Sequence, residues 1–347
     1  MSMEEIADLG LGHLRIGAPT GIAAGEYGPP QGFSNLREAV AAWEGVPIDE
    51  VCITTGASLG IVAALAGLQR PCSILCPRPF YPAYPQLAEL LGHEILFYDL
   101  DRERSWQPDP ADLPGLLRAD TRALLWNFPS NPTGAVPDPE TLAVVREVVQ
   151  GAGLLVLSDE VYADFLYGGT VFPDMRSALG PAWTVRVRSF SKVLGMAGER
   201  LGYVIAHPDR LSRICRSHWL LAMSPPAAAQ AMALAGIRTD PLRRIRELRD
   251  KLSGLRDLVG GILAQCDRIR FTAPPAGIFY WIEVLDCPID SRTLARACAT
   301  EAGVVVQPGV AFGIEHPVYL RASFAVEREE VARGFEALTD FLSRLPW

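Results

Sequence analysis

The chain has 347 residues, of which 49% are hydrophobic and 21% charged, and its formal net charge is −8. These values are typical of a globular protein that is long enough to bury a large core and to form more than one domain. The acidic balance argues against a nucleic-acid surface, and no apolar run approaches the ~18 residues of a membrane span. Residues 1–12 are acidic and lack the basic start of a secretory leader.

The seven cysteines are scattered along the sequence and odd in number. This spacing indicates small buried thiols rather than a disulfide framework. The closest pair, Cys72 and Cys76, has no second Cys/His pair at zinc spacing, so we expect no metal site. Unpaired thiols favour a reducing compartment, and we expect a cytoplasmic protein.

Glycine and proline are frequent in residues 1–33, which predicts an extended arm. A helix is expected to start with Ser34 as its N-cap, with Leu36, Val40 and Trp43 on one face. From residue 51 to residue 206, short β-rich runs alternate with helical stretches, which indicates an α/β fold with a mainly parallel sheet and helices on both faces. The expected strands are Val51–Thr54, Ser73–Cys76, Glu94–Tyr98, Ala123–Asn127, Leu154–Leu157, Thr184–Arg188 and Leu201–Ala206.

Residues 208–264 predict helices, including a long one that begins at Pro241. The C-terminal part mixes both kinds of element, which suggests a smaller α+β domain. Its expected elements are strands at Ile269–Thr272, Phe279–Val284, Val304–Gln307 and Tyr319–Phe324, and helices at Ser291–Ala302 and Glu327–Leu345. We therefore divide the chain into an N-terminal arm with a small-domain helix (1–44), a large domain (45–240) and a small C-terminal domain (241–347).

Lys192 is one of only two lysines, although the chain has 32 lysines and arginines together. A guanidinium keeps its charge, whereas an amine can lose its proton and attack a carbonyl. A lysine retained in so lysine-poor a chain therefore suggests a Schiff-base nucleophile. The hydroxyls of Ser189 and Ser191 precede it and Arg200 follows, and together these groups suit a phosphate.

Polar motifs follow several of the expected strands. Gly56-Ala57-Ser58 opens a helix, where backbone N–H groups can bind an anion. Asp159 ends a buried strand and would be costly there unless it is paired. Asn127-Phe128-Pro129-Ser130-Asn131-Pro132-Thr133-Gly134 is a turn-forming loop at the strand end where α/β sheets bind ligands. Arg321 lies inside an apolar strand and needs a carboxylate, either from the protein or from a ligand.

These motifs, with Ser-x-Ser-Lys followed by Gly-x-Arg-x-Gly, resemble those of fold-type I pyridoxal-phosphate enzymes, the class I/II aminotransferase family. The resemblance runs from about residue 27 to residue 324 and keeps the family's order. It implies that Lys192 holds pyridoxal 5′-phosphate as an imine, with Asp159 on the ring nitrogen and Tyr81 stacked on the ring. It further implies that Asn131 and Tyr162 bind the phenolic oxygen.

The resemblance also implies phosphate contacts and a place for the substrate. The implied phosphate ligands are Gly56, Ala57, Ser58, Ser189, Ser191, Arg200 and, from the neighbouring subunit of a homodimer with shared active sites, Tyr27. Arg321 would bind the substrate α-carboxylate, with Asn131 beside it. The expected reaction is transamination between an L-amino acid and an oxo acid in amino-acid metabolism.

Two departures from the family concern the substrate entrance. The arm before Tyr27 is short, and Pro274-Pro275-Ala276-Gly277 replaces a usual Gly-Gly pair. We expect His13 to lie either on the surface or in a shortened lid over the substrate. The cofactor motifs do not separate transamination from elimination, cyclisation, decarboxylation or oxidation. A cofactor-binding sensory module is the other class considered, but such modules usually follow a basic DNA-binding domain, which we do not expect here.

Overall fold

The larger of two sheets has eight strands in the computed structural model, which describes residues 27–69, 71–109 and 111–347. Its strand order is β1-β8-β7-β6-β5-β2-β3-β4. The strands are β1 (Val51–Thr54), β2 (Ser73–Arg78), β3 (Glu94–Asp101), β4 (Gln107–Pro108), β5 (Thr121–Asn127), β6 (Leu155–Asp159), β7 (Thr184–Ser189) and β8 (Gly202–Ala206). The central run β7-β6-β5-β2-β3 is parallel, whereas β1, β8 and β4 pair antiparallel.

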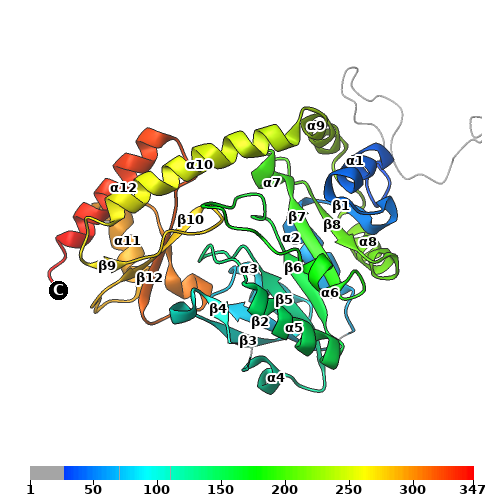
Figure 1. The fold of residues 1–347 in the computed structure, drawn as a ribbon, viewed down its shortest axis with the longest axis horizontal. Helices are drawn as coiled ribbons and strands as arrows, with labels where there is room; N and C mark the ends of the chain where they lie inside the picture. Colours follow the sequence, from blue (N-terminus) through cyan, green and yellow to red (C-terminus); the bar gives the residue numbers. More distant parts are fainter. Residues whose placement is uncertain (1–26, 70, 110) are drawn as a thin grey trace, which may run out of the picture.

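Helices cover both faces of this sheet, because alternate residues of its strands are apolar on opposite sides. In β5, Ala123 and Leu125 join the core under one face, while Leu124 and Trp126 join the core under the other. The first face packs against α2 (Gly56–Ala66), α3 (Ala83–Leu90) and α8 (Pro208–Ala222), and the second against α4 (Leu113–Leu116), α5 (Pro139–Ala152) and α6 (Met175–Leu179). Figure 1 shows α5 and α6 against the large sheet, away from the four-stranded sheet.

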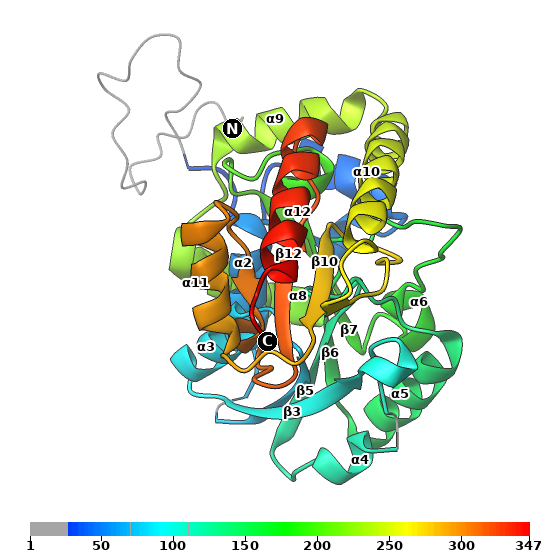
Figure 2. The same cartoon turned by 90° about the vertical axis from the view of Figure 1, so that its left-hand side faces the viewer.

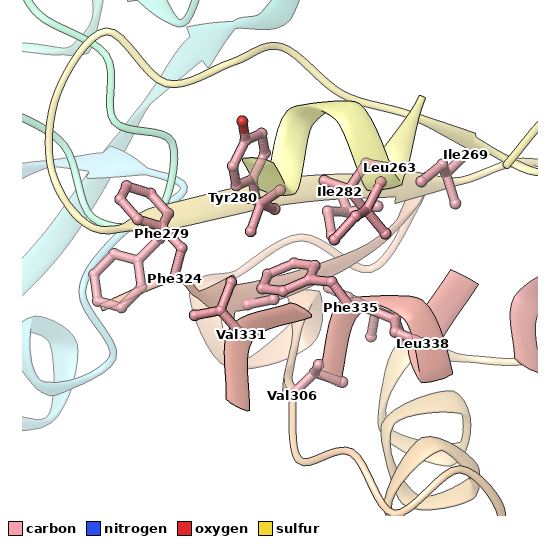
Figure 3. Close-up of a cluster of buried hydrophobic side chains, with 14 of the residues drawn as sticks. Leu263, Ile269, Phe279, Tyr280, Ile282, Val306, Phe324, Val331, Phe335 and Leu338 are labelled. Atoms are coloured by element: carbon pink, nitrogen blue, oxygen red, sulfur yellow. The ribbon is translucent and has the colours of Figure 1, made fainter. Parts of the chain in front are cut away.

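A second sheet, entirely antiparallel, has the order β11-β12-β10-β9 in the described part of the chain. Its strands are β9 (Ile269–Arg270), β10 (Phe279–Val284), β11 (Gln307–Pro308) and β12 (Val318–Ser323). The helices α10 (Pro241–Leu263), α11 (Ser291–Glu301) and α12 (Arg328–Ser343) share its hydrophobic core, and α12 runs beside α10 (Figure 2). Figure 3 shows Phe335 and Leu338 of α12 on the side of this core that faces Tyr280 and Ile282 of β10.

The N-terminal helix α1 (Ser34–Glu44) packs on the large sheet. Its buried residues Leu36 and Val40 share a core with Val51 and Tyr203, and it lies against α9 (Ala227–Arg238). This packing is on the opposite side of the molecule from the four-stranded sheet (Figure 1). By its contacts α1 belongs with the eight-stranded sheet, and the domain limits at residues 45 and 241 stay a prediction.

Several element limits differ from the sequence expectation. Ser34 is the first helical residue of α1, and the N-cap is Phe33, which has no capping side-chain hydrogen bond. The strand expected at Val304–Gln307 is reduced to Gln307–Pro308, because residues 302–306 turn out of α11 before pairing begins. The short strand β4 was not expected, since its two residues carry no periodic pattern. Short 3₁₀ turns at Ile48–Glu50 (η2), Arg102–Arg104 (η3) and Gly309–Phe312 (η4), and the four-residue helix α7 (Phe190–Val193), complete the fold.

Within the described part of the chain, none of the helices combines the length and the hydrophobicity that crossing a bilayer requires.

Candidate active site

A cavity of about 310 Å³ lies where the carboxyl ends of the parallel strands face the four-stranded sheet. The structure brings most of the predicted site residues to this cavity. Those that line it are Ala57, Ser58, Tyr81, Asn131, Asp159, Tyr162, Ser189, Ser191, Lys192, Arg200 and Arg321. Gly56 lies beside the cavity against the guanidinium of Arg200. Tyr27 is 57% exposed and does not line the cavity of its own chain, and His13 lies outside the described residues.

Parallel pairing explains why residues distant in the sequence meet here. Asn127 and Asp159 end adjacent strands and are direct partners in the register of β5 and β6. The Asn127 side chain donates to the carbonyl of Asp159 at 3.4 Å and accepts from the amide of Asn131 at 3.1 Å. Asn127 therefore ties the loop that carries Asn131 to the strand that carries Asp159.

Asp159 is a buried carboxylate at the base of the cavity. Its Oδ2 accepts a hydrogen bond of 2.6 Å from the hydroxyl of Tyr84, and its Oδ1 accepts one of 3.3 Å from the Val161 amide. Burial raises the pKa of Asp159, while these two hydrogen bonds act in the opposite direction. No cation of the described chain pairs with this carboxylate, so its charge is balanced only if a ligand presents a positive group.

Lys192 is half-buried and follows Ser189 by one short turn of helix α7. Burial is the largest cause that lowers the pKa of Lys192, and the charges of Arg321 and Arg200 lower this pKa further. No acceptor within the described residues holds its ammonium group. The free amine is therefore favoured at a lower pH than for an ordinary lysine, as a nucleophile for a carbonyl requires.

The end of the cavity near Arg200 has the features of an anion site. Gly56 begins α2 with a φ of +76°, and a Cβ at this position would lie 2.7 Å from Arg200 Nη2. Ser189 Oγ accepts a hydrogen bond of 3.1 Å from the amide of Ser191, and both serines line the cavity. Arg200 donates to the carbonyl of Ala197 and has no carboxylate partner among the described residues. Helix N-terminus, hydroxyls and guanidinium together suit a phosphate.

Arg321 comes from β12 of the second sheet and reaches across to the first. Its Nη1 donates to Asn131 Oδ1 at 2.8 Å, and its guanidinium lies 4.1 Å from the ring centre of Phe279 and 4.9 Å from that of Phe312. Its Nε is buried without a partner, and no carboxylate of the described chain lies within ion-pair distance. An internal salt bridge, the alternative left open by the sequence, is therefore not formed within these residues.

Two tyrosines complete the walls of the cavity. The Tyr162 ring meets Phe279 edge to face at 5.7 Å, and the Tyr81 ring meets Tyr84 edge to face at 5.4 Å. Burial raises the pKa of Tyr162, so its hydroxyl stays protonated and can donate to an oxygen of a ligand. Glu160, for which the sequence suggested no role, is fully buried away from the cavity and pairs with Arg186 at 2.8 Å.

The donor set fits pyridoxal 5′-phosphate. The cavity offers one uncompensated carboxylate, a lysine with a lowered pKa and two arginines without carboxylate partners. The cofactor and its substrate carry the complementary groups, namely a pyridinium, an aldehyde, a phosphate and an α-carboxylate. Each unbalanced charge in the cavity thus has a counterpart in the expected ligands.

Some residues of the site were not expected from the sequence. Tyr84 bonds Asp159 from behind, and Phe279 and Phe312 enclose Arg321. Tyr84 lies three residues after Tyr81, near the start of α3, and this spacing was the available signal. Asn127 was part of the quoted loop, but its structural bonds depend on strand pairing that no local pattern shows.

Comparison with solved structures agrees with this fold. The aromatic aminotransferase from Pyrococcus horikoshii superposes with a TM-score of 0.86 and 27% identity, covering 91% of this chain and 87% of that one. An aspartate aminotransferase from Thermotoga maritima superposes with a TM-score of 0.84 and 25% identity, covering 91% and 84%. Fold and cavity together define a fold-type I enzyme that uses pyridoxal 5′-phosphate.

Sequence comparison identifies the family. The model of the family "Aminotransferase class I and II" matches residues 19–338. The aspartate aminotransferase of P. horikoshii is 26% identical, with 97% of this chain and 90% of the relative covered. Aromatic-amino-acid aminotransferase 2 of Thermococcus litoralis is 29% identical, with 98% and 92% covered. The chain belongs to the class I and II aminotransferases, and it is a pyridoxal-phosphate-dependent aminotransferase.

Proposed function

We propose that Arg321 binds the α-carboxylate of an amino acid whose amino group then lies beside Lys192. One observation carries this assignment. Arg321 projects into the cavity with its guanidinium stacked on Phe279, and no carboxylate of the described chain neutralises it. A substrate carboxylate supplies the missing partner and two acceptor oxygens, which match the fork of the guanidinium.

The remaining residues then have defined tasks. Pyridoxal 5′-phosphate, when bound, supplies a carbonyl group that takes up amines and a ring that withdraws electrons. Lys192 Nζ, with its lowered pKa, is the base that would accept the proton from the substrate Cα and the acid that would deliver it to the carbonyl carbon of the cofactor. The second half of the reaction, with an oxo acid, would reverse this transfer. Asp159 balances a protonated ring nitrogen, and Tyr81 covers the ring. Tyr162 and Asn131 donate hydrogen bonds to the phenolic oxygen, and Gly56, Ala57, Ser58, Ser189, Ser191 and Arg200 bind the phosphate.

The walls of the cavity favour a substrate with an uncharged side chain. In the described chain, its cations are Lys192, Arg200 and Arg321, and each already has a partner in this scheme. The lining residues that remain are the apolar Ile61, Val161, Ala197 and Phe279, and Asn127, whose side chain is already bonded to Asp159 and Asn131. A second carboxylate would have to be buried without a cation, which is costly.

A homodimer with shared sites is part of this proposal. The end of α8 exposes Trp219, Leu220, Leu221 and Met223, and α9 exposes Met232. Exposed apolar side chains gathered in this way are typical of a subunit interface. Tyr27 precedes α1 near this surface, and from there it is proposed to reach the phosphate bound in the partner subunit.

A cytoplasmic location is supported by the thiols. The seven cysteines form no disulfide, and six of them are buried. Reduced thiols in this number suit a reducing compartment.

The test is a screen of single amino acids against the holoenzyme, following the visible absorbance of the bound cofactor and the oxo acid released. Neutral amino acids are expected to react faster than aspartate or glutamate. Arg321→Gln should lose this reaction while the cofactor remains bound. Normal turnover by the Arg321→Gln variant would contradict the carboxylate assignment, and preference for aspartate would contradict the uncharged side chain.

A further inference from the structure

A histidine accepts a hydrogen bond from the backbone of the turn that leads into helix α2. The amide of Thr55 donates a hydrogen bond of 3.0 Å to Nε2 of His218, a fully buried residue on α8. Thr55 is the N-cap of α2, and the three residues that follow it, 56–58, form the proposed phosphate site. This bond joins two segments that are 163 residues apart in the sequence.

The bond fixes the protonation state of His218. Because Nε2 accepts from a backbone amide, it carries no proton, and the neutral ring holds its proton on Nδ1. Burial also lowers the pKa of His218, which favours the neutral ring. Nδ1 has no partner in the described chain. A buried donor left without a protein partner is unusual in native proteins.

His218 binds the amide of the N-cap residue Thr55, and no side chain caps the amides of the first turn of α2. Threonine is a common N-cap because its hydroxyl accepts from an amide of the first turn. Here the Thr55 hydroxyl caps nothing and is buried without a partner. The first amides of α2 are thus left for a ligand, while the Thr55 amide is drawn toward α8.

Gly202 and Arg200 also make close contacts with the turn. A Cβ on Gly202 would lie 2.8 Å from the Ala57 nitrogen and 3.0 Å from the Gly56 carbonyl carbon. A Cβ on Gly56 would lie 2.7 Å from Arg200 Nη2. Strand β8 and Arg200 therefore lie in close contact with the turn, which the hydrogen bond to His218 also holds.

We propose that His218 is a positioning residue for the cofactor phosphate, acting through the Thr55 amide to hold the N–H groups of residues 56–58 in their binding direction. The proposal rests on the phosphate site described under the proposed function. It assigns to His218 no contact with the cofactor, and its effect is transmitted through the backbone of the turn.

The experiment compares cofactor binding by full-length apoenzyme variants, using pyridoxal 5′-phosphate and pyridoxal as separate probes. His218→Leu removes the acceptor, whereas His218→Gln keeps one. We expect His218→Leu to weaken binding of pyridoxal 5′-phosphate about tenfold, the effect of leaving one buried amide unpaired, with pyridoxal binding unchanged. His218→Gln should restore most of the affinity for pyridoxal 5′-phosphate.

A matched control exists at the other end of the same helix. His93 is also buried, and its Nε2 lies 3.1 Å from the carbonyl of Leu65 in α2. His93→Leu should lower the melting temperature. The ratio of its affinities for pyridoxal 5′-phosphate and pyridoxal should equal that of the wild type. If His218→Leu does not fold, His218→Met removes the same acceptor with a more adaptable side chain.

Three results would overturn the assignment of His218. The first is a His218→Leu variant that binds pyridoxal 5′-phosphate as tightly as the wild type does. The second is an equal loss of affinity for pyridoxal 5′-phosphate and for pyridoxal. The third is a His218→Gln variant that binds pyridoxal 5′-phosphate as weakly as His218→Leu does. A wild-type protein that bound pyridoxal as tightly as pyridoxal 5′-phosphate would instead contradict the phosphate site itself.

Discussion

The hydroxyl of Tyr84 donates a hydrogen bond of 2.6 Å to Oδ2 of Asp159, and both side chains are buried. The tyrosine comes from α3 and the aspartate from the end of β6, 75 residues later. Because Tyr84 stabilises the ionised carboxylate, it helps to keep Asp159 charged where burial favours the neutral acid. The charge of Asp159 is what the ring nitrogen of the cofactor requires.

Tyr84→Phe should therefore lower kcat/KM about tenfold, because it removes a hydrogen bond to a charged group. The pKa of Asp159 should rise further, since a group that lowers it is lost. Steady-state kinetics test this prediction. Tyr98→Phe is the control, because Tyr98 is equally buried and bonds only the carbonyl of Leu125. Equal activity in the two variants would show that Tyr84 only packs.

Asp159→Asn should stabilise the apoenzyme at neutral pH while abolishing activity. Burial raises the pKa of Asp159 above its value in the unfolded chain, so the unfolded state releases this proton at lower pH than the folded state. The ionised carboxylate thus destabilises the apoenzyme once the pH exceeds the unfolded pKa. The gain in melting temperature should shrink as the pH falls through about 4, the ordinary pKa of an aspartate, because below it the carboxyl is protonated in both states. Melting curves of apo variants across pH test this, and a gain that grew on acidification would contradict it.

Arg321→Lys should reduce kcat/KM for amino acids about 100-fold, since an ammonium cannot reproduce a bidentate, ring-stacked guanidinium. The visible absorbance of the bound cofactor should not change. Arg256→Lys is a suitable control, because Arg256 lies over the ring of Tyr167 at 4.9 Å but does not line the cavity. A loss of the same size in both variants would point to general destabilisation.

Arg321→Gln should also raise the pKa of Lys192, because the charge of Arg321 is one of the causes that lower it. The rate at which apoenzyme reacts with pyridoxal reports the fraction of free amine at Lys192. We expect the pH profile of this rate to move to higher pH in the variant. Lys251→Arg, which removes the exposed second lysine, should leave the profile in place. An unshifted profile in Arg321→Gln would show that burial alone sets this pKa.

Gly202→Ala should destabilise the protein by about 1–3 kcal/mol and weaken phosphate binding. The added Cβ would meet backbone atoms, including the Arg188 oxygen at 2.7 Å, and backbone cannot move aside as a flexible side chain can. Gly198 belongs to the same motif, but a Cβ there has nothing within 4 Å. Gly198→Ala should therefore behave as the wild type in thermal melts and cofactor titrations, and similar losses in both variants would contradict this reading.

The sequence could predict those site residues that follow a buried strand or belong to a compact motif. Lys192, Asp159 and Asn131 are of this kind, because strand ends in a parallel sheet meet at one edge. It could not predict Tyr84 or His218, whose partners lie 75 and 163 residues away and whose own surroundings resemble ordinary core. Ser34 shows the local limit: a good capping residue was expected at the N-cap, but the helix begins one residue earlier.

Dependence on residues distant in the sequence also limits what could be predicted about the place where the substrate binds. The stacking of Arg321 between Phe279 and Phe312 depends on the antiparallel register of β10 and β12 and on the turn at Gly309–Phe312. Neither the register nor the turn has a signal in the local sequence. The strand that carries Arg321 was nevertheless expected within one residue of its observed limits, Val318–Ser323.

The scarcity of lysine also limits where an aldehyde can react with the protein to form an imine. The second lysine, Lys251, is exposed and faces Glu327 at 3.2 Å, while the other side-chain cations are arginines, which do not form imines. An excess of pyridoxal 5′-phosphate thus has few amines to modify outside the cavity. Borohydride reduction of the loaded protein should yield one dominant labelled peptide, so that isotope-coded reagents can measure occupancy of this enzyme in crude mixtures without purification.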